Sequence, residues 1–261
     1  MAALSSVFPP GYFGNFFLVL VRVGAMIMTA PLIQGRAIPV MLKVGLALLI
    51  SFLLLPINQG HFVNVPFEWV PLSLLVVKEM GVGVLVGFVA NLVFAGAQFA
   101  GQVVGMQAGF NLANVIDPLF GQSLPILDQL YTILAGLLFL AIDGHHMLIL
   151  AVQQTFDIVP IGGLQITGPL FNQLALLTAG VFVAGLRLAL PIMAALLLAD
   201  VTLGLMARSF PQLNIFVVGL PVKLFLAFLL LLVTLPAMST VLQGFFRSSF
   251  VDLSNLLRLV G

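Results

Sequence analysis

The residues best placed to do chemistry in this sequence are two adjacent histidines and the aspartates around them. Asp143, His145 and His146 lie together in the stretch AIDGHHMLIL, and Asp157 follows on the same apolar segment. Imidazole and carboxylate groups can bind zinc or activate water. Adjacent histidines, however, are expected to point to different faces of a helix, and the HExxH spacing of zinc hydrolases is absent. We therefore expect no metal and no cofactor, and we favour capping, pairing or interface hydrogen bonds for these side chains.

Other catalytic signatures are also missing from the sequence. It contains no Gly-x-Ser-x-Gly nucleophile elbow, no Walker loop and no dinucleotide fingerprint, and without cysteine it has no thiolate nucleophile. An enzyme is therefore not expected, and no catalytic residue is assigned. An intramembrane hydrolase built on Asp143, His145 and Asp157 stays open as an alternative.

Composition identifies a membrane protein. Of the 261 residues, 62% are hydrophobic and 7% are charged, whereas roughly a quarter of the residues of a soluble domain are charged. The formal net charge of +1 and the absence of a Lys/Arg-rich run exclude a nucleic-acid-binding protein. The N-terminal stretch MAALSSVFPPG lacks a positively charged region, so we expect no cleaved signal peptide.

Apolar segments bounded by proline, glycine or charge predict an all-α integral membrane protein with six or so long, bent helices. The segments cover residues 12–33, 40–56, 70–104, 125–156, 174–206 and 222–243. In the tail that follows, apolar residues recur at spacings of four and three, which predicts an amphipathic helix. They are Phe246, Phe250, Leu253, Leu257 and Val260. A membrane interface, the groove of a partner and packing against the rest of the chain are all open destinations for this tail.

Besides Lys43 and Lys223 near segment ends, seven charged residues fall inside the apolar segments, where each would be costly if it faced lipid. They are Arg22, Lys78, Glu79, Asp128, Asp143, Arg187 and Asp200. A lone bundle of this size has little interior in which to hide them, so we expect several to face other subunits. The sequence therefore predicts an obligate assembly in which these are buried or interface charges.

Small residues recur every four positions near the end of the third apolar segment. They are Ala97, Gly101, Gly105, Gly109 and Ala113. Such a row lets a neighbouring helix come close, so it predicts a helix-packing surface. Beside the row, Asn91, Gln98 and Gln102 are placed to hydrogen-bond a partner helix or to line a wet cavity.

Residues 109–122, GFNLANVIDPLFGQ, are too apolar for a solvated loop and too broken for a spanning helix. Pro118 disfavours helix at Asp117, and Asn111 and Gly121 are turn formers. Irregular backbone is tolerated at membrane depth only when it is buried in protein or lines a water-filled cavity. The apolar side chains fit either a plug that closes a pore by dewetting or a re-entrant loop packed for structure alone.

Four stretches of the chain carry a resemblance to a known family. They are APLIQGRAIPVMLKVGLALLISFLLLP (residues 30–56), GMQAGFNLANVIDP (105–118), DGHHMLILAVQQTFDIVPIG (143–162) and FPQLNIFVVGLPVKL (210–224). In order and in spacing, from about residue 12 to about residue 245, the sequence resembles the FliR/SctT family of type III secretion export-gate proteins, and most closely its flagellar members.

The resemblance implies a single-copy subunit of a helical hetero-oligomer with FliP and FliQ, to which FlhB is attached. This complex is the channel that unfolded flagellar subunits enter, driven by protons and an associated ATPase. The family fold consists of bent helical hairpins in the bacterial inner membrane, at the flagellar basal body, partly raised to the periplasmic side. By this resemblance, residues 1–261 form a single export-gate membrane domain: residues 1–200 are FliP-like, 201–245 supply a FliQ-like hairpin turn and helix, and 246–261 are the amphipathic tail.

The family's plug loop falls on residues 109–122 of this chain. The resemblance assigns the pore plug to Phe110, Asn111, Leu112, Val115, Ile116, Asp117, Pro118 and Phe120, with Asp117 and Pro118 fixing the turn. The family often has asparagine where this chain has Asp143.

From the resemblance as a whole, we expect a non-enzymatic channel subunit that contacts membrane lipid and unfolded export substrates. A small-molecule or ion secondary transporter, which also places charges and broken helices at mid-membrane, is the alternative.

Overall fold

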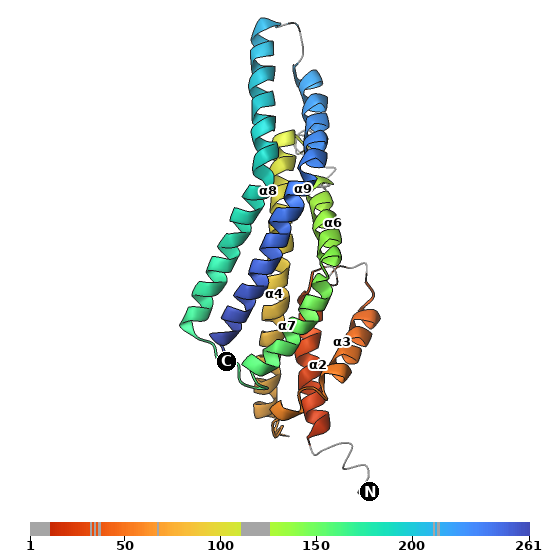
Figure 1. Ribbon diagram of the computed structural model, residues 1–261, viewed down its shortest axis with the longest axis vertical. Coiled ribbons are helices and arrows are strands. Elements are labelled where there is room, and N and C mark those ends of the chain that lie inside the picture. Colours follow the sequence, from red (N-terminus) through yellow and green to blue (C-terminus); the bar gives the residue numbers. More distant parts are fainter. Residues whose placement is uncertain are drawn as a thin grey trace. The chain divides into compact units, whose positions relative to one another are not determined.

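Helices are the only regular secondary structure in the part of the chain that the computed structural model describes (Figure 1). The described residues are 11–31, 33, 35, 38–66, 68–110, 126–210, 212 and 215–261. In chain order the helices are α2 (Tyr12–Thr29), α3 (Val40–Leu54), the short 3₁₀ helix η1 (Gln59–His61), α4 (Trp69–Ala108), α6 (Ile126–Ala141), α7 (Gly144–Ile158), α8 (Gly168–Ser209) and α9 (Ile215–Arg258). No strand occurs among these residues, which confirms the all-α class.

Each of the six predicted apolar segments coincides with a helix, although the fourth is divided between α6 and α7. The helices α2, α4, α8 and most of α9 are long and apolar enough to cross a membrane. Together α6 and α7 count as at most one broken span, and α3, with 15 residues, is shorter than the roughly 20 that a bilayer requires. The described helices therefore supply four or five candidate spans of an integral membrane protein.

The helices gather into two compact units that interleave along the sequence. Unit 1 comprises Met1–Leu92, Asp143–Leu177 and Arg247–Gly261, and unit 2 comprises Val93–Ile142 and Thr178–Phe246. The helices α4, α8 and α9 each continue from one unit into the other. Each unit is therefore built from segments that are far apart in the sequence.

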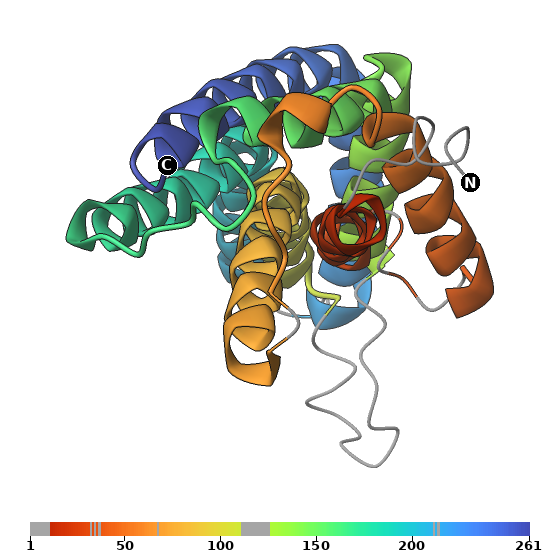
Figure 2. The same ribbon diagram turned by 90° about the horizontal axis from the view of Figure 1, so that it is seen from below.

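The core of unit 1 forms around α2. Leu18, Val19 and Val23 share one face of this helix and are fully buried. In the view of Figure 2, α2 is seen end-on with α3 beside it, and the two helices pack together. On another side, α4 approaches α2 most closely at Gly83 and Gly87. Helix α2 thus buries one face against neighbours from its own chain, while Phe13 and Phe17 stay exposed.

The C-terminal tail is the last part of α9 and packs within unit 1. Helix α9 continues without a break to Arg258. On the predicted apolar stripe, Leu253, Leu257 and Val260 are each at most 2% exposed. The backbone N–H of Gln165 donates to the carbonyl of Val260 at 2.8 Å, and α7 lines the other side of the groove beneath the tail. Of the three destinations that the sequence left open, the structure shows packing against the chain itself.

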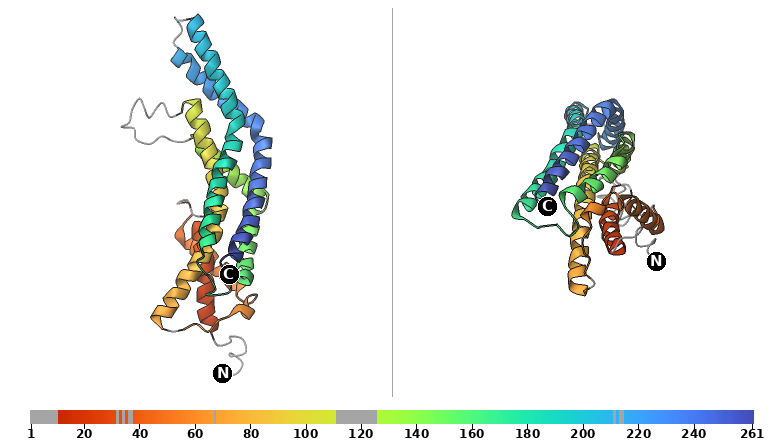
Figure 3. Two further views of the ribbon diagram at one scale, coloured as in Figure 1. Left: turned by 90° about the vertical axis from the view of Figure 1, so that its left-hand side faces the viewer. Right: turned by 60° about the horizontal axis from the view of Figure 1, so that its bottom comes forward.

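Unit 2 is centred on three phenylalanines from three helices. The ring centroids of Phe94 on α4, Phe139 on α6 and Phe246 on α9 lie 5.3 to 5.8 Å apart. Edge-to-face and tilted ring pairs of this kind add to the stabilisation that burial provides. In the same unit, α8 and α9 run side by side (Figure 3), and Lys223 Nζ pairs with Asp200 Oδ1 at 2.7 Å. The aromatic cluster and the α8–α9 hairpin together form the scaffold of unit 2.

Truncation of Leu257 tests the packing of the tail. Leu257 is 2% exposed, whereas Leu259 is 39% exposed. Leu257→Ala should therefore lower the free energy of unfolding by about 2–5 kcal/mol, the usual loss for a buried leucine. The matched Leu259→Ala should change it by less than about 0.5 kcal/mol. Denaturant titration of the purified protein in detergent, followed by circular dichroism, measures both; equal losses in the two variants would show that the stripe is not packed.

Candidate functional site

The predicted plug follows the C-terminus of α4, which Gly109 caps. Helix α4 ends at Ala108, and Gly109 has a φ of +92°, a left-handed conformation that glycine adopts freely and other residues adopt at a cost. The N–H of Phe110 donates to the carbonyl of Gly105 at 3.1 Å, and the N–H of Gly109 donates to the carbonyl of Met106 at 3.2 Å. These two bonds make a Schellman motif. Gly109, which the sequence assigned to the packing row, therefore also terminates α4.

Phe110 is the one residue of the predicted plug that lies within the described part of the chain. Its ring centroid is 6.1 Å from that of Phe228 on α9, with an interplanar angle of 85°. Edge-to-face pairs of this kind contribute about 0.5–1.5 kcal/mol beyond burial. The other predicted plug residues lie outside the described residues: Asn111, Leu112, Val115, Ile116, Asp117, Pro118 and Phe120. The structure thus anchors the first aromatic of the loop on α9.

The small-residue row of α4 packs against the first turn of α6. Ala97 is fully buried, and a methyl group on Gly101 would lie 2.6 Å from the Cα of Asp128 and 2.8 Å from the carbonyl oxygen of Leu127. At Gly105 the nearest atom to such a methyl group is 3.9 Å away. The closest approach is therefore at Gly101, and the neighbouring helix belongs to the same chain.

Asp128, one of the seven charged residues, lies at this contact. It is 9% exposed, and Gln102 Nε2 donates to its Oδ2 at 3.4 Å. No described residue donates to its other carboxylate oxygen. Gln102, which the sequence placed toward a partner helix or a wet cavity, thus bonds within the chain. Ala113, the last member of the small-residue row, lies outside the described residues.

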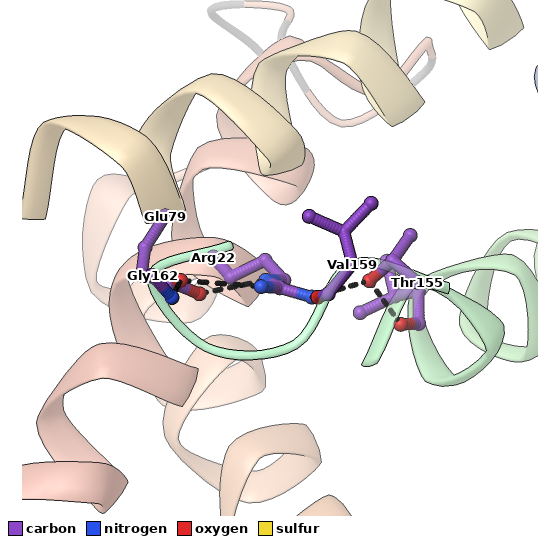
Figure 4. A network of polar contacts seen from close by, with 6 residues as sticks. Arg22, Glu79, Thr155, Val159 and Gly162 are labelled. Atoms are coloured by element: carbon purple, nitrogen blue, oxygen red, sulfur yellow. Dashed lines mark hydrogen bonds and ion pairs between the residues drawn. The ribbon is translucent and has the colours of Figure 1, made fainter. Parts of the chain in front are cut away.

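The most deeply buried charges form a network in unit 1 (Figure 4). Arg22 on α2 and Glu79 on α4 are 0% and 1% exposed. Arg22 Nε donates to Glu79 Oε2 at 2.7 Å, and Nη2 donates to Oε1 at 3.1 Å. Arg22 Nη1 donates to Thr155 Oγ1 and to the carbonyl of Val159, each at 3.0 Å. The guanidinium carbon also lies 4.1 Å from the ring centroid of Phe156. The bidentate pair is thus enclosed by groups from α7 and the residue that follows it.

Helix α4 also holds the loop after α7. Glu79 Oε1 accepts a hydrogen bond from the N–H of Gly162 at 2.8 Å, and Lys78 Nζ donates to the carbonyl of the same residue at 2.9 Å. Two neighbouring side chains of α4 thereby fix both backbone groups of Gly162. The network joins α2, α4, the end of α7 and the following loop.

The remaining residues of the seven predicted buried or interface charges differ in whether they have a partner within the described part of the chain. Asp200 accepts from Gln107 Nε2 at 3.0 Å in addition to its pair with Lys223. Asp143 and Arg187 are exposed. Of the two possibilities predicted from the sequence for these charges, burial or an interface, Arg22 and Glu79 are buried in their own chain.

The cluster of Asp143, His145 and His146 lies on the surface at the start of α7. Asp143 has a φ of 57°, a left-handed conformation that aspartate and asparagine tolerate better than most residues. The expectation that the histidines diverge is wrong, because their ring centroids lie 4.2 Å apart. Asp143 Oδ1 lies 3.3 Å from His146 Nδ1, and one ligand atom from each residue lies within 4.8 Å of the others. These donors could touch a cation, but all three residues are exposed, so water competes for each of them.

Asp157 does not join this cluster. It is twelve residues after His145 on α7, which corresponds to about 18 Å along a helix. Its Oδ1 lies 3.9 Å from His61 Nε2 instead. The hydrolase alternative required Asp143, His145 and Asp157 in one place, and the structure keeps Asp157 apart.

Comparison with known proteins gives the family. The family described as bacterial export proteins, family 1, matches residues 13–249. The flagellar biosynthetic protein FliR of Escherichia coli K12 is 36% identical over 244 residues, which cover 93% of this chain and 92% of that protein. FliR of Bacillus subtilis 168 is 31% identical over 256 residues, which cover 95% and 96% of the two chains. The chain belongs to the FliR family. Family membership and the apolar helices together make it a membrane-embedded component of flagellar protein export.

Four residues that contribute to the ion-pair network were not predicted from the sequence, although they lie within residues 13–249, which match the family. Thr155, Phe156, Val159 and Gly162 contact the ion pair directly or through Glu79. All four belong to the FliR-like motif at residues 143–162. Only this motif could have indicated them, because Val159 and Gly162 contribute backbone groups, which every residue type has.

The buried ion pair can be tested by removing one charge and then both. Arg22→Met leaves Glu79 buried without its cation, so it should lower the free energy of unfolding by about 3–5 kcal/mol. The double variant Arg22→Met/Glu79→Met should lower the free energy of unfolding by less than Arg22→Met alone, because it leaves no unpaired charge of this ion pair buried. The same denaturant titration measures both. A double variant that is less stable than the single one would argue against a charge-driven network.

The contact at Gly101 predicts a second effect. A methyl group there would overlap the backbone of α6, so Gly101→Ala should destabilise the protein by about 1–3 kcal/mol. A methyl group on Gly180 of α8 would instead point into open space, with no neighbouring atom within 4 Å, so Gly180→Ala should be neutral or stabilising by up to about 1 kcal/mol. Thermal unfolding of both variants in detergent makes the comparison. Equal tolerance at the two positions would refute the close α4–α6 approach.

Proposed function

We propose that this chain is a channel-forming subunit of the flagellar type III protein export gate. In this role it passes unfolded flagellar subunits across the bacterial inner membrane as part of a hetero-oligomer with FliP and FliQ, with FlhB attached. Membership of the FliR family supports the export role. The chain performs no enzymatic step in this proposal, and the energy for export comes from other components of the apparatus.

The observation that carries the proposal is the length of three apolar helices. Helices α4, α8 and α9 contain 40, 42 and 44 residues, which corresponds to about 60–66 Å of helix. The hydrocarbon core of a bilayer is about 30 Å thick. Large apolar side chains nevertheless stay exposed along most of α8, from Phe171 at 63% to Leu205 at 62%. Lipid covers only about half of such a length, so other protein must cover the rest.

This excess length supports an assembly that is partly raised out of the bilayer. In the proposal, the raised part lies on the periplasmic side of the inner membrane, at the flagellar basal body. Prolines inside the long helices allow the bends that such an assembly needs, since Pro191, Pro221 and Pro236 each remove one helical hydrogen bond. Neighbouring subunits then cover the apolar faces that extend beyond lipid.

We assign closure of the channel to the loop of residues 109–122. Its base supports this role, because the Schellman motif at Gly109 directs the chain away from α4 and Phe110 packs on Phe228. Apolar side chains close a narrow pore by filling it and by excluding water. In this proposal Phe110 attaches the start of the loop to α9, and the residues that follow it form the barrier.

Deletion of residues 110–120 tests the proposed function. With its partners present, the shortened chain should assemble but let ions pass, because the apolar barrier is gone. Membrane potential in cells expressing the complex, followed with a voltage-sensitive dye, should fall relative to the unchanged chain. A matched variant keeps the loop length and replaces Phe110, Leu112, Val115, Ile116 and Phe120 by serine; it should also leak, because a polar loop does not exclude water.

Two results would contradict the plug. An intact ion barrier in the deletion variant, with the complex unchanged in amount and composition, would assign closure to other residues. Substrate-dependent flux of a small solute through the purified chain alone would favour the transporter alternative.

A further inference from the structure

Arg187 is an exposed cation within an apolar helix face. It is near the middle of α8, and its neighbours on the same face, Val183 and Leu190, are 52% and 54% exposed. Arg187 itself is exposed, and no hydrogen bond or ion pair joins it to another residue in the part of the chain that the structure describes. A guanidinium facing hydrocarbon is strongly unfavourable, so this position requires a counter-charge.

Pro191 increases the polarity of the same spot. It lies one turn after Arg187, inside α8, and is also exposed. Because proline has no N–H, the carbonyl of Arg187 loses its usual helical donor. A guanidinium and an under-bonded carbonyl from one residue thus occur together on this face. The spot offers donors to an acidic group and an acceptor to a neighbouring N–H or O–H.

The described acidic residues of unit 2 do not neutralise Arg187. They are Asp128 and Asp200. Asp200 is paired with Lys223, and Asp128 is buried against Gly101 and Gln102. Neither described acidic residue of this unit therefore pairs with Arg187.

The pattern of exposure around Arg187 argues against a lipid headgroup as its partner. At the level of the headgroups, an exposed apolar face gives way to polar residues on one side. Here exposed apolar side chains continue in both directions along α8, from Leu176 at 68% before Arg187 to Leu198 at 66% after it. A water-filled lumen would also favour more polar residues on this face. An apolar helix with a single embedded carboxylate complements it better.

We propose that the face of α8 around Arg187 docks an apolar helix of a neighbouring subunit, and that a carboxylate of that helix forms a bidentate pair with Arg187. The inference rests on the proposed function, because it needs a partner subunit. Arginine suits the site because its planar fork binds both carboxylate oxygens at once, which lysine cannot do. The pair selects the partner and fixes its register along α8.

The test uses the tagged chain expressed with the neighbouring export genes. Arg187→Glu and Arg187→Gln should reduce the amount of other subunits that copurify per tagged chain by at least about tenfold, because a buried carboxylate on the partner loses its cation. Arg187→Lys should retain part of the complex. The matched controls, Arg258→Glu and Arg258→Gln, change an exposed arginine in the last turn of α9, beyond residues 13–249. They should leave copurification and motility near the unchanged level.

Two further experiments identify the partner. Motile revertants of Arg187→Glu should carry an Asp or Glu changed to Lys or Arg in an apolar helix of another subunit. A photo-crosslinking residue in place of Leu190, in the otherwise unchanged chain, should form adducts with that same helix. This second experiment does not depend on the stability of an Arg187 variant.

Several outcomes would overturn the inference. One is an Arg187→Glu variant that assembles and exports like the unchanged chain. Others are crosslinks from position 190 only to lipid or only to exported substrate, or an Asp117→Asn variant that reproduces the loss seen with Arg187→Gln, which would place the counter-charge in this chain. If the unchanged chain itself purifies without other subunits, the proposed function fails. If its complex forms and Arg187→Glu leaves it intact, only the inference fails.

Discussion

The exposed apolar faces of α4, α8 and α9 require cover over a greater length than a bilayer provides. The burial of apolar surface is the main favourable term in helix packing in water, and inside lipid close packing and satisfied polar groups replace it. A helix of 40 or more residues meets both environments. The short helix α3 also exposes large apolar side chains, with Met41 at 89% and Phe52 at 62% exposed. These exposed apolar faces agree with the proposal that neighbouring subunits cover them.

Polar contacts between helices give the two units defined internal geometry despite these exposed apolar faces. In unit 1 the Arg22–Glu79 pair joins α2 and α4, and its further hydrogen bonds reach Thr155 and Val159. In unit 2, Lys223 and Asp200 join α9 and α8, and Gln107 extends the contact to α4. The Arg22–Glu79 network, whose two side chains are 0% and 1% exposed, is costly to break in a low dielectric. These contacts fix the register of the joined helices within each unit.

Much of the fold could be predicted because long apolar runs separated by turn formers leave few alternatives to helices. The division between α6 and α7 was missed, since only the Asp143–Gly144 pair marks it and no proline interrupts the run. The apolar segment 222–243 and the helical tail were predicted separately, whereas α9 joins them in one helix that runs through Pro236 to Arg258. Proline ends many helices, but packing of the tail on α7 favours continuation here.

The contacts of the candidate site were harder to predict than the helices. Arg22 and Glu79 each stood out as charges in apolar surroundings, but 57 residues separate them and only the fold brings them together. Their remaining partners are largely backbone groups, which residue types do not reveal. The small-residue row did indicate a close helix contact, and Gly101 provides it within the chain. The plug beyond Phe110 is still a prediction from the sequence, since it lies outside the described residues.

In the proposed function, this chain works as one subunit of a larger export gate. The most direct measurement is the native mass and subunit composition of an affinity-tagged copy, extracted in mild detergent from cells that express the whole neighbouring operon. We expect one large species that contains a single copy of this chain and several copies of two smaller hydrophobic proteins. A stable monomer or a symmetric dimer without other subunits would contradict it.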